Sequence, residues 1–314
     1  MNSPGINDIL DAAHRISAYV HHTPILTSSS INEILKSEIY FKCENLQKVG
    51  AFKYRGATNA VQQLTSTQLQ HGVATHSSGN HAQALALAAK IKNAKAYIVM
   101  PNNAPKIKKE AVIGYGAEVI ECEPTLEARE STLNQILEEK NAHFIHPYND
   151  YRIVAGQATA AKELIEDTPE LDYMIAPVGG GGLLSGTALS AHYFSPNIKV
   201  IGAEPTGADD AFRSLKAGKI IPSYKPQTIA DGLLTSLGDR TFPIIQKFVE
   251  QILTVEDSMI IQAMKLIWQR MKIIVEPSAA VPLAVVMKNQ PYFEKKKIGI
   301  ILSGGNVDLD KLPF

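Results

Sequence analysis

Short apolar runs alternate with alanine- and leucine-rich stretches along most of the chain, and this alternation constrains the fold more than any other feature. Strand-like runs lie at 96–100, 118–121, 174–178, 200–204 and 299–302. Helix-like stretches lie at 80–90, 106–115, 127–140, 155–165, 184–194 and 257–271. The alternation predicts parallel strands joined by crossover helices. Because the strand runs are continuously apolar, we expect helices on both faces of an α/β fold.

Three loops rich in glycine and serine follow predicted strands. They read 75-THSSGNHAQ-83, 177-PVGGGGLLSG-186 and 301-ILSGGNVD-308. Ligands of open α/β sheets bind at the carboxyl ends of the strands, where helix N-termini also lie. We therefore expect the three loops to meet at one edge of one sheet and to form a binding site there.

Composition excludes several classes of partner. The 314 residues carry 31 Lys plus Arg and 31 Asp plus Glu, so no overall charge attracts nucleic acid or an anionic membrane. The two cysteines form no CxxC pair, and a reducing cytoplasmic location is expected. The apolar run 173–194 is broken by four successive glycines, which argues against a membrane span. A small-molecule partner is the expectation.

The run Gly179–Gly182 predicts a phosphate site. Glycines allow successive backbone N–H groups to converge, and a helix beginning near Leu183 adds the partial positive charge of its N-terminus. A dinucleotide fingerprint is excluded, because Leu184 or Ser185 occupies the third glycine position of GxGxxG. No GK[ST] sequence follows either, so a P-loop is also excluded.

One lysine, Lys53, lies between Gly50 and Gly56 in 47-QKVGAFKYRGATNA-60. Most lysines are solvated surface residues, and such a lysine needs no glycines around it. A phosphate-bearing ligand, a lysine flanked by glycines and the lack of a nucleotide motif together indicate pyridoxal phosphate, which enzymes hold through a lysine.

The segment AFKYRGATNA resembles the S-F-K-x-R-G-A segment of the tryptophan-synthase-like (fold type II) pyridoxal-phosphate enzymes. SSGNH, VGGGGLLSG and LSGGN occur in the order and spacing of that family, from about Thr23 to Asp308. Within it the chain is similar to the serine racemase branch of the serine/threonine dehydratases. The resemblance implies a homodimer and a two-domain α/β fold with twisted, mainly parallel sheets and flanking helices. A large cofactor-binding domain would comprise 1–67 and 147–314, and a small domain 68–146.

The resemblance also implies a role for each residue around the cofactor. Lys53 would hold the cofactor as a Schiff base, and Phe52 would pack against its ring. Asn80 would hydrogen-bond its phenolic oxygen, and Ser303 would face its pyridine nitrogen. The phosphate would be held by Gly179, Gly180, Gly181, Gly182 and Leu183.

The activity implied by the resemblance is interconversion of L- and D-serine, with loss of the β-hydroxyl to give pyruvate and ammonia as a side reaction. Racemisation needs an acid or base on each face of a planar intermediate, and the candidates are Lys53 and Ser78. Ser78 has a second reading, in which it only binds the substrate carboxylate. The loop that would bind substrate comprises Ser77, Ser78, Gly79, Asn80 and His81.

A cation site is indicated at 201-IGAEPTGADDAF-212. Glu204 and Asp210 could supply oxygen ligands, with the Ala208 carbonyl as a third. Acidic loop residues are more often solvated than liganded. The E-P-x-x-A-D-D pattern, however, resembles the site for Mg²⁺, Ca²⁺ or Mn²⁺ in serine racemases, so we expect a metal here.

Arg129 matches an arginine of racemases and threo-3-hydroxyaspartate ammonia-lyases, where a guanidinium would bind a second substrate carboxylate. Its alternative is a surface arginine paired with Glu127 or Glu130. Lys48 matches ATP-stimulated animal relatives but Val49 does not, which leaves ATP open as an activator. Alternative functions are L-threo-3-hydroxyaspartate ammonia-lyase, L-serine/L-threonine dehydratase and, in a different class, a non-catalytic pyridoxal-phosphate-binding module.

Overall fold

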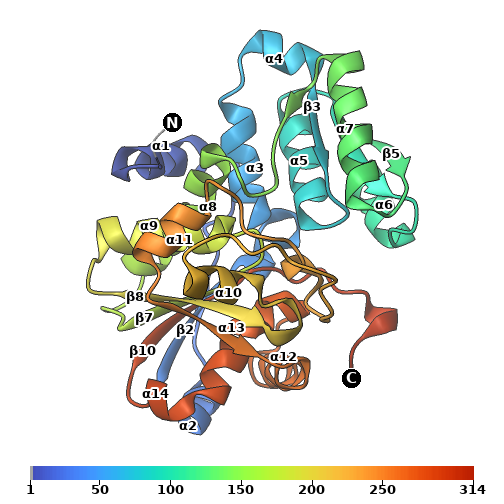
Figure 1. The fold of residues 1–314 in the computed structure, drawn as a ribbon. Helices are drawn as coiled ribbons and strands as arrows, with labels where there is room; N and C mark the ends of the chain where they lie inside the picture. The colour runs from blue at the N-terminus through green and yellow to red at the C-terminus, as the bar shows by residue number, and fades with distance from the viewer. Residues whose placement is uncertain (1–2) are drawn as a thin grey trace.

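The strands of the protein form two separate sheets, seen in the computed structural model, which describes residues 3–314 (Figure 1). The larger sheet has the order β1-β2-β10-β7-β8-β9 and the smaller the order β5-β4-β3-β6. The strands of the larger sheet are β1 (Ile25–Leu26), β2 (Glu38–Cys43), β7 (Tyr173–Pro177), β8 (Lys199–Pro205), β9 (Gln251–Val255) and β10 (Lys297–Leu302). Those of the smaller sheet are β3 (Val73–His76), β4 (Ala96–Pro101), β5 (Glu118–Cys122) and β6 (His143–Phe144).

Neighbouring strands run parallel in both sheets, except that β1 pairs antiparallel with β2. The predicted α/β class with mainly parallel sheets is therefore confirmed. Every strand run predicted from the sequence overlaps β4, β5, β7, β8 or β10. The other strands, β1, β2, β3, β6 and β9, were not among the predicted runs; β1 and β6 have only two residues each, which gives no periodic signal.

Helices connect the strands, and all six predicted helices are present. These are α5 (Asn80–Ile91), α6 (Lys106–Gly114), α7 (Leu126–Lys140), α8 (Tyr151–Glu166), α9 (Gly182–Phe194) and α12 (Asp257–Met271). The others are α1 (Ile6–Ile16), α2 (Ser29–Leu35), α3 (Lys53–Gln62), α4 (Ser66–His71), α10 (Asp210–Ala217), α11 (Phe242–Phe248), α13 (Pro277–Lys288) and α14 (Gln290–Phe293). No helix within residues 3–314 is long and apolar enough to cross a bilayer.

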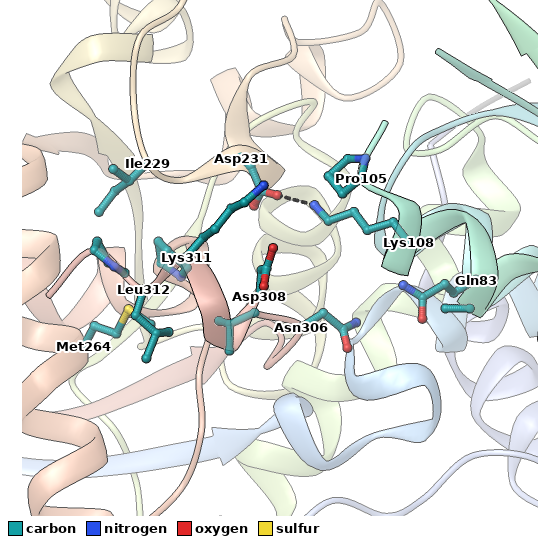
Figure 2. Close-up of a pocket in the computed structure, with 14 residues that line it drawn as sticks. Gln83, Pro105, Lys108, Ile229, Asp231, Met264, Asn306, Asp308, Lys311 and Leu312 are labelled. Carbon is teal, nitrogen blue, oxygen red and sulfur yellow. Dashed lines mark hydrogen bonds and ion pairs between the residues drawn. The ribbon is translucent and has the colours of Figure 1, made fainter. Parts of the chain in front are cut away.

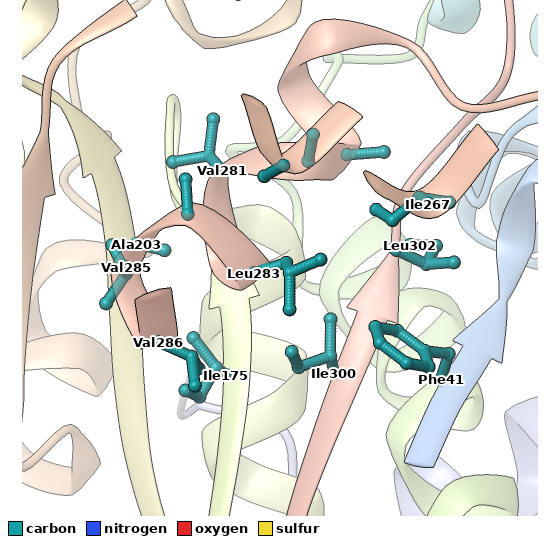
Figure 3. Packing of buried hydrophobic residues seen from close by; sticks show 14 of the residues in the cluster. Phe41, Ile175, Ala203, Ile267, Val281, Leu283, Val285, Val286, Ile300 and Leu302 are labelled. Carbon is teal, nitrogen blue, oxygen red and sulfur yellow. The ribbon is translucent and has the colours of Figure 1, made fainter. Parts of the chain in front are cut away.

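Helices cover both faces of the larger sheet. On one face α2, α12 and α13 pack on the strands, and Figure 3 shows Val281, Leu283 and Val285 of α13 lying over β7, β8 and β10. On the other face α8 and α9 pack, with α10 and α11 beside them. Burial on both faces explains why these strands are continuously apolar rather than alternating.

The smaller sheet is also covered on both faces, by α3, α5 and α6 on one side and by α7 on the other. Strand β4 is buried throughout, as its apolar sequence predicts. The same expectation is wrong for β5, which is an edge strand and has only Cys122 buried. Glu118 and Glu121 are charged and exposed, which is typical of an edge strand.

The expectation that three glycine-rich loops share one sheet edge is wrong. The loops that begin at Val178 and Ser303 follow β7 and β10 of the larger sheet. The loop 77–79 follows β3 and belongs to the smaller sheet. The loops therefore come from two sheets, and any site between them is formed only where the sheets meet.

Close packing of α3 against α8 joins the region around Lys53 to the rest of the protein. A Cβ atom on Gly156 of α8 would lie 2.6 Å from the Cα of Gly56 in α3 and 2.8 Å from the carbonyl oxygen of Arg55. Both close contacts are with backbone, which cannot move aside as a flexible side chain can. A Cβ on Gly56, one of the two glycines that flank Lys53, would likewise lie 2.9 Å from the backbone carbonyl oxygen of Ile153 in α8, so Gly56 and Gly156 are both required for helix packing.

We predict that Gly156→Ala lowers the free energy of unfolding by about 1–3 kcal/mol, because the added methyl forces α3 and α8 apart. Urea denaturation would measure the change. Gly114→Ala is the matched control, since a Cβ at this exposed helix residue meets nothing within 4 Å and should leave stability unchanged or slightly raised. Equal effects in the two variants would contradict the packing argument.

Candidate active site

The segment before α3 is attached to the end of β10. Ala51 forms an isolated antiparallel bridge with Gly304, and the Phe52 N–H donates a 3.0 Å hydrogen bond to the carbonyl oxygen of Ser303. These contacts place Lys53, the first residue of α3, at the carboxyl end of the larger sheet. Ser303 is buried beside it. The structure thus brings Lys53, Phe52 and Ser303 together, although they are far apart in the sequence.

Lys53 occupies a desolvated position. Its Nζ donates a 2.8 Å hydrogen bond to the Pro147 carbonyl oxygen and lies 5.3 Å from the centre of the Phe52 ring. Burial lowers the pKa of Lys53 to about 8, against the opposing effect of the negative charge on Glu276. A lysine whose pKa lies near neutrality has a substantial fraction of neutral amine, the form that acts as a nucleophile or base.

A buried ion network holds α3 in place. The fully buried guanidinium of Arg55 donates to both carboxylate oxygens of Glu44, each at 2.8 Å, and to both of Glu163, at 2.6 and 2.8 Å. The Nζ of Lys42, also fully buried, lies 2.6 Å from Glu163. The positive charges of Arg55 and Lys42 therefore balance the negative charges of Glu44 and Glu163, and Arg55 is only two residues from Lys53.

A second polar network joins the two sheets. Asn80 of the smaller sheet's loop donates to both carboxylate oxygens of Glu276, at 3.0 and 3.1 Å. The Asn306 side chain donates to the side-chain oxygen Oδ1 of Asn80 at 2.9 Å, and its backbone N–H donates to the Glu276 carboxylate at 3.2 Å. A Cβ on Gly304 would lie 2.8 Å from the Glu276 carboxylate. The glycine in SGGN is therefore needed for this carboxylate to approach.

Glu276 is a residue for which sequence reasoning found no role. Burial raises the pKa of Glu276 to about 7, with a further contribution from the charge of Asp231, while hydrogen bonds from Asn80 and Asn306 lower it. Its sequence signal was an acid followed by Pro277 at a helix start, which also fits a simple helix cap. Only the fold shows that it lies between the two sheets.

The run Gly179–Gly182 forms a turn at the N-terminus of α9. Gly181 has φ 88°, a left-handed conformation that strongly favours glycine. A Cβ on Gly180 would lie 2.3–2.5 Å from three carbon atoms of the Tyr148 ring, and one on Gly179 would lie 2.9 Å from the Cα of Leu233. Within residues 3–314, the N–H groups of Gly179–Leu183 donate to no other residue. The turn therefore presents free donors, as the prediction of a phosphate site requires.

The loop of Ser77, Ser78 and Gly79 lies at the carboxyl end of β3, before α5. The Ser77 N–H donates to the Val99 carbonyl oxygen at 3.1 Å, and the Gly79 N–H donates to the Ser77 Oγ at 3.4 Å. Ser78 lies between them and is partly exposed. His81, by contrast, is buried with its Nε2 3.2 Å from the Ile145 carbonyl oxygen. Burial and the charge of Lys53 hold the pKa of His81 well below its usual range, so His81 is neutral.

A row of aromatic rings borders the loop. His76 stacks on Phe144, which contacts His146, and His146 meets Tyr148 edge-on with the ring centres 4.6 Å apart. Burial and the nearby charges of His76 and Lys53 lower the pKa of His146 to about 4. Its Nδ1 accepts two backbone N–H groups, at 3.2 and 2.9 Å, so the proton of neutral His146 is on Nε2.

Arg129 lies on α7 near the start of this row. Its Nε donates to the Thr125 carbonyl oxygen at 3.3 Å, and its positive charge contributes to lowering the pKa of His76. Neither Glu127 nor Glu130 forms an ion pair with it among the described residues. Arg129 therefore lies near enough to His76, the residue that precedes the loop 77–79, for its charge to affect the pKa of that histidine.

The residues of the expected cation site lie together at the end of β8 and just after it. Glu204 accepts the N–H groups of Ala211 and Phe212, both at 2.8 Å, and Ala208 lies in the intervening turn. Both carboxylate oxygens of Asp210 are buried without a partner in the part of the chain that the structure describes. Burial raises the pKa of Glu204 to about 8 and that of Asp210 to about 6. Unpartnered buried oxygens of this kind suit a cation.

Side chains alone do not complete that site. Across residues 3–314 no three His, Cys, Asp or Glu side chains are grouped so that they could hold a metal ion. A cation between Glu204 and Asp210 would therefore also need backbone oxygen, such as the Ala208 carbonyl, and water, which is usual for Mg²⁺ and Ca²⁺.

Each sheet with the helices that cover it forms one lobe of the protein. A cavity of about 320 Å³ lies beside Asn306, where the two lobes meet (Figure 2). Gln83 and Lys108 line it from the smaller lobe, and Asp231 and Asp308 line it from the larger. The Lys108 Nζ lies 2.6 Å from the Asp231 carboxylate across the cavity mouth, which adds an ion pair between the lobes.

Comparison with known proteins assigns the family. The family model "Pyridoxal-phosphate dependent enzyme" matches residues 16–304. The chain belongs to this family. It is 53% identical over 311 residues to a serine racemase of Dictyostelium discoideum, covering 98% of this chain and 96% of the relative. It is 50% identical over 314 residues, covering 100% of both, to a beta-hydroxyaspartate dehydratase of Paracoccus denitrificans. The crystal structure of the Dictyostelium serine racemase superposes with a TM-score of 0.93, at 52% identity, over 97% of this chain and 99% of that one.

The residues of this family member fit pyridoxal phosphate. Lys53, with its lowered pKa, suits covalent attachment of the cofactor, and the free N–H groups of Gly179–Leu183 suit its phosphate. Phe52 and Ser303 lie at the same end of β10 as Lys53, where they could contact the ring.

We predict that the amine of Lys53 titrates near pH 8 in the cofactor-free protein. Acetic anhydride modifies only neutral amines, so labelling of Lys53, followed by mass spectrometry, should rise with a midpoint near pH 8. Glu276→Gln should move the midpoint to lower pH, because the negative charge of Glu276 raises the pKa of Lys53. A midpoint above pH 10 would contradict the desolvated environment, and an unmoved midpoint in Glu276→Gln would contradict the coupling.

Proposed function

We propose that this protein is a pyridoxal-phosphate-dependent enzyme that interconverts L- and D-serine and also eliminates water from serine to give pyruvate and ammonia. The observation that carries the proposal is Lys53, a lysine with a pKa near 8 that is held at the carboxyl end of the larger sheet beside Ser303. Sequence identity above 50% to a serine racemase supports the choice of reaction.

Bound pyridoxal phosphate supplies an electron-withdrawing ring that makes the Cα proton of an amino acid acidic. The protein must then hold and move that proton. The neutral amine of Lys53 takes it from, or returns it to, one face of Cα. The hydroxyl of Ser78 acts on the opposite face, and Ser77, Gly79, Asn80 and His81 surround the substrate carboxylate. Removal of the Cα proton from one face and return of a proton to the other face inverts the configuration.

Serine also carries a β-hydroxyl group that can leave once the Cα proton has been removed. The ratio of D-serine to pyruvate is then set by how fast Ser78 or Lys53 returns a proton to Cα. His146, neutral and with its proton on Nε2, lies next to Tyr148 near this part of the site.

We predict that the purified protein converts L-serine to D-serine and pyruvate, as measured by chiral chromatography and a keto-acid assay. Ser78→Ala should lower D-serine formation by about 100-fold or more, because one face then has no proton donor. The visible absorbance of the bound cofactor should remain.

Ser131→Ala is the control, since this hydroxyl lies on exposed α7 and bonds only the Ala128 carbonyl oxygen. D-serine formation that survives in Ser78→Ala would show that Ser78 only binds substrate. Cofactor absorbance without any turnover would instead favour a non-catalytic pyridoxal-phosphate-binding module.

A second candidate is an ammonia-lyase acting on L-threo-3-hydroxyaspartate. Arg129, free of ion pairs with Glu127 and Glu130 and close to His76, could bind the second carboxylate of this substrate. The 50% identity to a beta-hydroxyaspartate dehydratase supports it. Faster turnover of hydroxyaspartate than of serine, lost in Arg129→Ala, would favour it. Keto acid from L-serine or L-threonine without D-serine would indicate a plain dehydratase.

A cation, Mg²⁺ or alternatively Ca²⁺ or Mn²⁺, is part of the proposal. Glu204, Asp210 and the Ala208 carbonyl would hold it. Its support is the pair of buried Asp210 oxygens for which no described residue is a hydrogen-bond partner. Because the pKa values of both acids are raised, binding a cation requires loss of protons and is favoured at higher pH.

We predict that Mg²⁺ raises the unfolding temperature more at pH 8.5 than at pH 5.5. A carboxyl group whose pKa is raised stabilises the fold at low pH and loses this effect as pH rises through the folded-state value, here about 6 for Asp210 and 8 for Glu204. The cation compensates for that loss. Asp210→Asn should abolish the Mg²⁺ response, whereas Asp209→Asn, which lies in a surface pair with Arg213, should keep it. A response that Asp210→Asn leaves intact would refute this site.

The proposal also includes a homodimer, a cytoplasmic location and ATP as an activator, together with a large domain of 1–67 and 147–314 and a small domain of 68–146. All strands of the smaller sheet lie between Val73 and Phe144, which supports the division. Lys48 and the cavity between the lobes are where ATP would be sought. Light scattering would test the dimer, and the serine assay with and without ATP would test activation.

A further inference from the structure

The buried hydroxyl of Thr241 lies behind the glycine turn, and neither the sequence patterns nor the comparisons assign it a role. Thr241 precedes α11 and has no exposed surface. Its Oγ1 donates a 2.8 Å hydrogen bond to the carbonyl oxygen of Gly180 and accepts one of 3.0 Å from the N–H of Gly238. The Gly238 carbonyl oxygen is a more distant alternative acceptor, at 3.2 Å. A hydroxyl has only one proton to donate, and the shorter distance assigns it to the carbonyl oxygen of Gly180.

The bond to Gly180 fixes the direction of the neighbouring amide. A trans peptide unit is planar, and its C=O and N–H point in opposite directions. When Thr241 holds the Gly180 carbonyl on its side of the turn, the N–H of Gly181 must point to the other side. The Gly181 N–H is one of the N–H groups of Gly179–Leu183, which have no acceptor among residues 3–314.

Thr241 is itself held firmly. The Ser185 Oγ of α9 donates to its carbonyl oxygen at 3.2 Å. The turn before it is tied to the segment that carries Tyr148, because Asn149 accepts the N–H of Arg240 at 2.9 Å and donates to Asp239 at 2.7 Å. The space between Thr241 and the turn is also closed, since a Cβ on Gly181 would lie 2.9 Å from the Thr241 Oγ1.

We propose that Thr241 is a positioning residue for the phosphate of the cofactor: it turns the Gly180–Gly181 peptide so that the Gly181 N–H donates into the phosphate cradle. Without the hydroxyl, this peptide can rotate and present its carbonyl oxygen, which repels a phosphate. The inference rests on the pyridoxal phosphate of the proposed function and concerns its phosphate group alone.

The test compares pyridoxal phosphate with pyridoxal, which lacks the phosphate. Both are titrated into the full-length protein after removal of its own cofactor, and binding is followed by absorbance. The dissociation constant of pyridoxal divided by that of pyridoxal phosphate measures what the phosphate contributes to binding. Thr241→Val, which keeps the shape of the side chain, should reduce this ratio by roughly 3- to 10-fold, the value of one hydrogen bond. Thr241→Ser, which keeps the hydroxyl, should restore most of it.

The control is Ser190→Ala, which removes another fully buried hydroxyl from α9, one that donates at 2.8 Å to the Ala158 carbonyl oxygen away from the turn. It should leave the ratio unchanged. Equal weakening of both ligands in Thr241→Val would overturn the inference, because it would indicate general loosening. A wild-type protein that does not prefer pyridoxal phosphate to pyridoxal would overturn it as well. Tight binding without turnover of serine would refute only the proposed reaction.

Discussion

The buried ion network of Arg55 is the constraint on which the site depends. Arg55 lies two residues after Lys53 and is fully enclosed between Glu44 and Glu163, which come from the end of β2 and from α8. A guanidinium buried without partners would be strongly destabilising, so the observed orientation of α3, in which Arg55 reaches all four carboxylate oxygens, is strongly favoured. The close glycine contact of α3 with α8 adds a steric limit. Together they fix where the lysine projects.

From that fixed lysine the site is completed by elements of two sheets. The larger sheet contributes the glycine turn, Ser303 and Glu276, while the smaller contributes the serine loop and Asn80. The hydrogen bonds between Asn80, Glu276 and Asn306 cross the boundary between them. Buried apolar residues of α3 also pack against α5 and the smaller sheet, so both apolar and polar contacts hold this boundary.

Much of this arrangement follows from residue patterns, and the failures have physical causes. The continuous apolar strands and the glycine turn were predicted because burial and backbone freedom restrict residue type strongly. The placement of the SSGN loop on the same sheet as the other two loops was wrong, because a strand and its loop carry no signal for which sheet they join. The packing of Tyr148 on Gly180 and the contact of Thr241 behind it were not predicted, since each depends on a segment distant in sequence.

The sequence by itself determined the α/β class, because burial on both faces of a sheet restricts local composition, and its family resemblance indicated pyridoxal phosphate with Lys53 and the glycine turn as the candidate residues that hold it. Tertiary structure decided the chemistry of that lysine. The lowered pKa of Lys53, the raised pKa of Glu276 and the direction of the glycine amides all arise from desolvation and from contacts between segments far apart in the chain. Burial and long-range contact are properties of the folded molecule, and no short stretch of residues encodes them.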